Sequence, residues 1–294
     1  MKRIIFVLII VFFAAAFLFL FWKNEPSNKI DGKPRVTTSV YPMYFLTSRI
    51  TGGKIDVINI TPAGAEPHDY QLTPSDIIKI RTSKLLVLNG SIEPWSGKII
   101  DDLKNKNVQI IAVGEDYIKN GDPHVWLSPR LAKFEAQKIA SAIEQIDPAN
   151  RVFYEENLQK LESELDNLDQ SYRRDLRVCA TRRFVTSHQA FTYLANEYGL
   201  QQISIEGLSP DEEPSLSKIA ELANLIRKDK IKYVFFESLV SPKLAQTLAN
   251  EAQAETLVLD PIEGIKDEDL RRGIDYLTLM NNNLQNLRVA MDCR

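Results

Sequence analysis

A long stretch without glycine divides the sequence into two parts that are alike in kind. From residue 148 to about residue 174 the only proline is Pro148, and apolar side chains recur at helical spacing between acids and amides. The recurring apolar residues are Val152, Leu158, Leu161, Leu165 and Leu168. This spacing predicts an amphipathic helix roughly 40 Å long. Because an ordinary crossover helix is shorter, we interpret it as a connector between two domains. A coiled-coil arm would need a more sustained heptad repeat.

The part before the connector alternates short β-type runs with helix signals. The runs rich in β-branched and apolar residues are at 35–41, 56–60, 85–88 and 108–113. Proline at the first helical position, as at Pro42 and Pro74, indicates helices between these runs. The order of strand and helix predicts a parallel sheet with right-handed crossovers.

The part after the connector repeats this alternation. Its β-type runs are at 183–187, 202–205, 232–236 and 255–259, and a final helix is predicted at 268–291. The sequence therefore predicts an α/β protein of two (β/α)4-type domains with parallel sheets, joined by one long helix. The predicted boundaries are 35–147 for the first domain, 148–175 for the connector and 176–294 for the second domain.

Residues 1–34 have the character of a targeting segment followed by a polar linker. Lys2 and Arg3 precede an unbroken apolar run at 4–22. A run of this length can span a bilayer, which takes about 20 residues, whereas the apolar region of a signal peptide is usually only ~7–15 residues. Cleavage after Ala16 would leave an apolar new N terminus. We therefore favour an uncleaved membrane anchor over a removed signal, and either one places the rest of the chain outside the cytoplasm.

The chain has two cysteines, Cys179 and Cys293, both in the second part. In an oxidising compartment they could form a disulfide. Two free thiols are an equally good interpretation of the sequence. The spacing of the cysteines does not fit a thiolate zinc site.

The only three histidines of the chain, His68, His124 and His188, each follow a β-type run. Ligands of open α/β sheets bind beyond the carboxyl ends of the strands. Neutral imidazole suits zinc and other first-row divalent ions. Any one of these histidines could be an unrelated hydrogen-bonding residue, but their equivalent places favour a common metal site.

Acidic residues near the strand ends could complete such a site. Zinc takes four ligands and accepts carboxylate oxygen beside imidazole nitrogen. Glu237 and Asp260 both end β-type runs of the second part, although either could be a capping or surface acid. Glu66, Asp69 and Asp122 flank the histidines and could accept their second ring N–H groups. Two ligands from each part would place the ion between the domains, a common place for a small-ligand site.

Several segments resemble motifs of one known family, the metal-binding component of zinc and manganese ABC importers. The matching segments are 40–42 (VYP), 61–70 (TPAGAEPHDY), 122–127 (DPHVWL), 186–191 (TSHQAF), 258–261 (VLDP) and 276–284 (YLTLMNNNL). The resemblance covers about residues 35–290. It implies a solute-binding protein of two domains joined by one rigid helix.

The resemblance also implies the site and the partners. It makes His68, His124, His188 and Asp260 the four metal ligands and places Glu237 nearby without coordinating the ion. The expected partners are a divalent ion, a permease and its ATPase. We expect a monomer outside the cytoplasm, tethered to the membrane through residues 4–22.

A nitrogen-rich site favours zinc, with manganese as the alternative. Manganese members of the family often carry glutamate where this chain has His188, which points the same way. The chain departs from the family at Ser128, where aspartate is usual, and in lacking a histidine-rich loop.

Other classes of function find less support. The net charge of −3 and the absence of a basic run with interleaved aromatics argue against nucleic-acid binding. A hydrolase would need an open coordination position on the metal and a nearby general base. A fourth protein ligand would occupy that open position. A surface adhesin, a label attached to some members of the family, has no specific support in this sequence.

Overall fold

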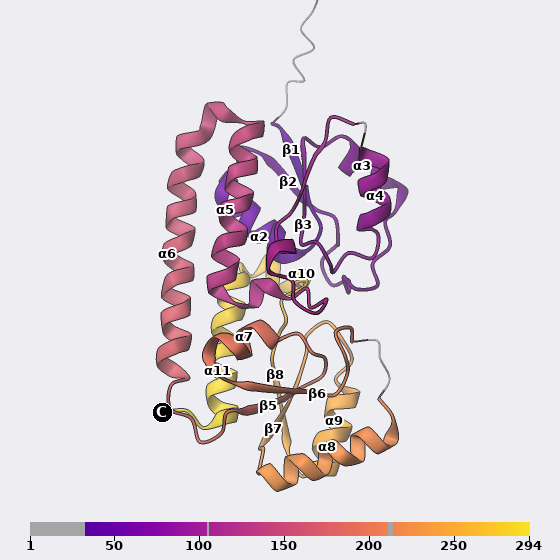
Figure 1. Cartoon of the computed structure of the whole chain (residues 1–294), viewed down its shortest axis with the longest axis vertical. Coiled ribbons are helices and arrows are strands. Elements are labelled where there is room, and N and C mark those ends of the chain that lie inside the picture. The colour runs from indigo at the N-terminus through magenta and orange to yellow at the C-terminus, as the bar shows by residue number, and fades with distance from the viewer. Residues whose placement is uncertain (1–32, 105, 211–213) are drawn as a thin grey trace, which may run out of the picture. The chain divides into compact units, whose positions relative to one another are not determined.

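The computed structural model describes residues 33–104, 106–210 and 214–294 (Figure 1). The apolar run at 4–22 lies outside the described residues, so the membrane anchor stays a prediction. Among the described residues, no helix has both the length and the apolar character that crossing a membrane requires.

The first part forms a four-stranded parallel sheet. Its strands are β1 (Arg35–Thr38), β2 (Asp56–Asn59), β3 (Leu85–Leu88) and β4 (Gln109–Ala112), in the order β2-β1-β3-β4. The helices between them are α2 (Tyr41–Thr51), α3 (Pro74–Arg81) and α4 (Ser96–Leu103). The central strand β3 is entirely apolar and entirely buried, as expected for a strand covered on both faces.

The second part forms another four-stranded parallel sheet in the same spatial order. Its strands are β5 (Arg183–Thr186), β6 (Gln201–Ser204), β7 (Tyr233–Phe236) and β8 (Glu255–Val258), in the order β6-β5-β7-β8. The helices between them are α7 (Thr192–Tyr198), α8 (Leu216–Asp229) and α9 (Lys243–Ala252). The predicted fold class, α/β with two parallel sheets, is confirmed.

The connector is helical and packs along both parts. A short 3-10 turn, η3 (Pro148–Asn150), leads into α6 (Arg151–Asp175), which lies beside α5 (Pro129–Ile146) in Figure 1. Its buried side chains are Tyr154, Leu161, Leu165, Leu168 and Tyr172. Val152 was wrongly assigned to this face, because its side chain is exposed. Since Pro34–Arg294 forms one compact unit, α6 is no free arm. The exact domain boundaries stay a prediction.

The predicted final helix at 268–291 is wrong, because two helices occupy this region. They are α10 (Asp267–Arg271) and α11 (Tyr276–Met291). Gly273 lies in the left-handed region at φ 72°, a conformation that interrupts a helix. Asp275 then accepts the backbone N–H of Thr278 and caps α11. The two signals were present in the sequence as a glycine followed by an aspartate.

A disulfide joins Cys179 and Cys293, which settles the question that the sequence left open. The bond links the segment after α6 to the residues that follow α11. Tyr172 of α6 reinforces this association, because its hydroxyl donates to the carbonyl of Met280 in α11 at 2.7 Å. The connector is therefore fastened to the second part near its end.

A carboxyl group on α5 is buried inside the fold. Glu135 of α5 is fully buried, and neither of its carboxylate oxygens has a hydrogen-bond partner among the described residues. Burial, opposed only by the charge of Lys138, raises the pKa of Glu135 to about 8. This group is consequently protonated over much of the neutral range.

Candidate metal centre

His68 lies in the loop that follows β2. The Glu66 carboxylate accepts the backbone N–H of His68 at 3.2 Å and so turns the chain at this point. Gly64, at φ 80°, donates its N–H to the carbonyl of Ile265 at 2.9 Å, which ties the loop to the segment after β8. The imidazole of His68 is 13% exposed, so this ligand candidate lies nearest to solvent.

His124 follows β4 and stands immediately before a 3-10 turn, η2 (Val125–Leu127). The Asp122 carboxylate accepts the backbone N–H of His124 at 3.1 Å and contacts ring Nδ1 at 2.8 Å. An N–H at Nδ1 leaves the lone pair on Nε2, the atom that faces the other histidines. The ring is fully buried. The prediction that Asp122 serves His124 is therefore confirmed.

His188 follows β5 and is held in the same way. The Glu237 carboxylate, at the end of β7, contacts Nδ1 of His188 at 2.7 Å. The carbonyl of His188 accepts hydrogen bonds from Thr186 at 2.8 Å and from Gln202 at 2.9 Å. Glu237 therefore orients the imidazole, and Nε2 of His188 is again the atom left to face a ligand.

The three imidazoles meet at one carboxylate, that of Glu263. Its Oε1 lies 2.8 Å from Nε2 of His124, 3.2 Å from Nε2 of His188 and 3.5 Å from Nε2 of His68. One nitrogen or oxygen from each of the four residues lies within 4.8 Å of the others. His68 Nε2 is buried without a hydrogen-bond partner among the described residues, a deficit that a metal ion could remove.

Asp260, the fourth ligand that the resemblance implies, is not one of these four clustered residues, and its role as a ligand stays a prediction. Its Oδ1 accepts the backbone N–H of Ile262 at 2.7 Å, and its Oδ2 accepts the hydroxyl of Ser238. The side chain of Asn283 holds both the N–H and the carbonyl of Asp260, at 2.8 and 2.6 Å. With both oxygens engaged, Asp260 fixes the turn from which Glu263 projects.

Glu263 was not among the residues that the sequence singled out. It lies past the end of β8, after a proline and after Ile262, whose φ of 58° is rare for a β-branched residue. This unusual backbone turns the chain so that Glu263 points back at the histidines. The rule that ligands stand at strand ends favoured Asp260, which is the residue at the strand end.

Charge and burial together shift the pKa values of the clustered residues. Burial raises the pKa of Glu263, but its contacts with the three imidazoles outweigh burial and hold this pKa well below its usual range. Burial lowers the pKa of His124 and of His188. The carboxylates around the two rings have the larger, opposite effect, so both pKa values are raised above the ordinary value. Burial and the nearby Glu263 charge raise the pKa of Glu66 to about 9. Anionic oxygen and imidazole thus face one another in a buried space that suits a cation.

Comparison with known proteins identifies relatives of the whole folded part. A family model described as zinc-uptake complex component A, periplasmic, matches residues 36–290. The high-affinity zinc uptake system protein ZnuA of Bacillus subtilis (strain 168) is 36% identical over 290 residues, which cover 92% of this chain and 91% of that protein.

Two further comparisons concern a streptococcal relative. The zinc-binding lipoprotein AdcA of Streptococcus pneumoniae (strain ATCC BAA-255 / R6) is 36% identical over 286 residues, or 90% of this chain, which spans only 57% of that protein. The crystal structure of the Zn(II)-bound ZnuA-like domain of Streptococcus pneumoniae AdcA superposes with a TM-score of 0.80 at 37% identity. That match covers 89% of this chain and 100% of the domain.

Proposed function

Because the chain belongs to the family of the periplasmic zinc-uptake complex component A, we propose that it is the substrate-binding component of an ABC importer, which captures zinc outside the cytoplasm and delivers it to a membrane permease. The observation that carries this proposal is the convergence of three imidazole nitrogens and one carboxylate oxygen within 4.8 Å. Zinc binds tetrahedrally to such a set of nitrogen and oxygen ligands.

We propose that the ligands are Nε2 of His68, His124 and His188 together with the carboxylate of Glu263. The support is that these four groups already face one another, whereas both oxygens of Asp260 are engaged in the turn. Asp122 and Glu237 fix the tautomers of two of the rings, as outer partners of zinc-bound histidines commonly do. Each sheet would supply two ligands through loops that follow its strands.

The same arrangement favours carriage of the ion over chemistry on a substrate. A catalytic zinc keeps one coordination position for water or substrate, whereas four protein ligands leave a tetrahedral ion none. The imidazoles of His124 and His188 and the carboxylate of Glu263 are all buried, so a second reactant would have little access. Release of the ion then requires the loops of the two sheets to separate.

Competition titration of the metal-free full chain tests the proposal. We expect one zinc ion per chain, and we expect zinc to displace manganese because imidazole suits zinc better than the oxygen-preferring Mn²⁺. Cobalt bound in place of zinc should give the intense absorption of a tetrahedral ion. Equal affinity for the two metals, or an octahedral cobalt spectrum with exchangeable water, would contradict a zinc carrier.

Changing His188 to glutamate should narrow the preference for zinc over manganese. The substitution replaces a nitrogen ligand by oxygen, which costs zinc more than manganese, and we expect zinc affinity to fall roughly 100-fold. The matched control is Gln189→Glu, which adds the same charge at an exposed neighbour. If the zinc-to-manganese ratio changes equally in both variants, charge alone is responsible and His188 does not set the preference.

We also propose that residues 4–22 tether the protein to the cytoplasmic membrane. The support is the unbroken apolar composition of this run, which lies outside the described residues. The native protein should fractionate with membranes and keep its first residues. N-terminal sequencing of the native protein that begins after Ala16 or later would disprove the tether.

A further inference from the structure

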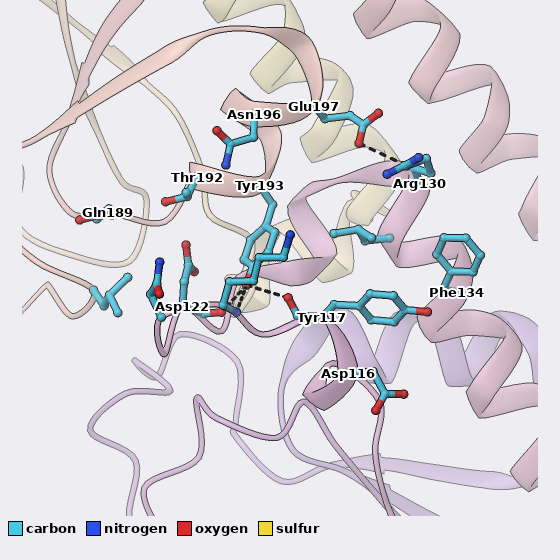
Figure 2. Close-up of a pocket in the computed structure, with 14 residues that line it drawn as sticks. Asp116, Tyr117, Asp122, Arg130, Phe134, Gln189, Thr192, Tyr193, Asn196 and Glu197 are labelled. Atoms are coloured by element: carbon cyan, nitrogen blue, oxygen red, sulfur yellow. Dashed lines mark hydrogen bonds and ion pairs between the residues drawn. The ribbon is translucent and has the colours of Figure 1, made fainter.

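A tyrosine of the second part is hydrogen-bonded to the loop that carries His124. Tyr193, on α7, accepts the backbone N–H of Lys119 at 2.9 Å, and its hydroxyl faces the carbonyls of Asp122 at 2.9 Å and Tyr117 at 3.2 Å. Figure 2 shows these bonds as dashed lines converging on the ring that descends from α7. The side chain is 8% exposed. One hydroxyl thus satisfies backbone groups from a segment that belongs to the other sheet.

The loop it contacts leads directly to a proposed ligand. Between the 3-10 turn η1 (Glu115–Tyr117) and His124, the chain turns through Asn120 and Gly121, both at positive φ. Asp122 then holds the His124 ring through its carboxylate, while its own carbonyl accepts the Tyr193 hydroxyl. Tyr193 therefore acts on the residue that orients His124, without contacting the imidazole itself.

A cavity lies beside this contact. Its volume is about 750 Å³, and it is lined by Tyr117 and Lys119 near the loop, by Phe134 of α5 and by Thr192 and Asn196 of α7. The ion pair between Arg130 of α5 and Glu197 of α7 also borders it. Figure 2 shows Tyr193 crossing this space. Because open space lies beside the hydroxyl, the loop has room to shift when the hydroxyl is lost.

We infer that Tyr193 is a positioning residue for zinc retention, an inference that rests on the proposed function. His188 lies five residues before Tyr193 in the same segment, and His124 lies two residues after Asp122. The Tyr193–Asp122 bond therefore sets how far apart the two imidazoles stand, with Nε2 atoms 3.4 Å from each other in this structure. When the distance between the two imidazoles is no longer fixed, both nitrogens coordinate the ion less well at the same time, and the ion is released faster.

The test compares Tyr193→Phe with Tyr198→Phe in the full chain. Tyr198 is on the same helix and equally buried, but its hydroxyl donates to Asp169 of α6 at 3.0 Å and does not touch the His124 loop. Each variant loses one buried hydroxyl and keeps the ring. Zinc release into excess chelator should be about tenfold faster in Tyr193→Phe and within about twofold of wild type in Tyr198→Phe. The cobalt absorption band should change in the first variant alone.

The outcomes separate the two proposals. If the wild-type chain binds no zinc, the proposed function fails before the variants are compared. If it binds zinc and both variants release it at the wild-type rate, the role of Tyr193 alone is overturned. Equal acceleration in both variants would mean general loosening of the fold and would also overturn it.

A measurement on the wild type covers the case in which Tyr193→Phe does not fold. Coupling between two sites is reciprocal, so a contact that favours bound zinc must itself be favoured by zinc. The Lys119 amide, which donates to Tyr193, should exchange its hydrogen more slowly in the zinc-loaded chain than in the metal-free chain. Equal exchange rates in the two states would overturn the inference.

Discussion

Replacing Glu263 with glutamine is expected to lower zinc affinity by roughly 100-fold or more, since even loss of an outer partner costs 10–100-fold. Glutamine keeps the shape of the side chain but removes the anionic oxygen that lies 2.8 to 3.5 Å from the three imidazoles. The buried ion would then be bound by neutral ligands alone, and its charge would be poorly compensated. The affinity is measured by competition with a chromophoric chelator at fixed pH.

Asp260→Asn is the matched control for this prediction. It makes the same chemical change three residues earlier, on a carboxylate that accepts hydrogen bonds from Ile262 and Ser238. We expect it to lower thermal stability and to reduce zinc affinity less than about tenfold, through a shift of the turn. If Asp260→Asn costs more zinc affinity than Glu263→Gln, then Asp260, as the family resemblance implies, is the fourth ligand.

Replacing Glu135 with glutamine should stabilise the fold at alkaline pH and leave it nearly unchanged near pH 5. The pKa of this buried carboxyl is raised from its ordinary value of 4.5 to about 8, so the folded state holds a proton that the unfolded state gives up. Its contribution to stability is fully present below the ordinary pKa and is lost as pH rises to the folded value. At pH 8 the variant should gain roughly 4 kcal/mol of unfolding free energy.

Urea unfolding of the metal-free chain between pH 5 and 8.5 measures this effect. The wild-type unfolding free energy should fall more steeply with pH than that of Glu135→Gln, by the slope of one proton. Glu144→Gln, on the same helix at a half-buried position near Arg151, is the control and should keep the wild-type slope. Parallel slopes for wild type and Glu135→Gln would show that this carboxyl is ionised inside the folded protein.

Local patterns were sufficient to predict the framework of the fold. The strand predicted at 85–88 has those bounds in the structure. Its continuous apolar run fits a strand of a parallel sheet that is buried on both faces. The connector at 148–175 is helical because no glycine interrupts it. The sequence predicted one final helix where the structure has two, because periodic apolar residues continue across the break at Gly273.

The site could be predicted only as far as position along a strand determines it. The histidines follow strand ends, and the topology brings strand ends together. Glu263 depends instead on the backbone at Ile262, and the pairing of the cysteines depends on a Cα separation of 3.9 Å that the whole fold sets. Tyr193 acts across a distance of 71 residues in sequence from Asp122, which no local pattern encodes.

The bond between Cys179 and Cys293 makes the timing of folding depend on location. The two cysteines are 114 residues apart in sequence. By the chain-entropy model, a loop of this size raises the free energy of the unfolded chain by about 5 kcal/mol, because it lowers the conformational entropy of that chain. The cytoplasm keeps thiols reduced, so a chain destined for export lacks this constraint while it is still inside the cell. Such a chain is easier to hold unfolded for passage across the membrane, and it becomes harder to unfold once it has reached the side on which zinc is collected.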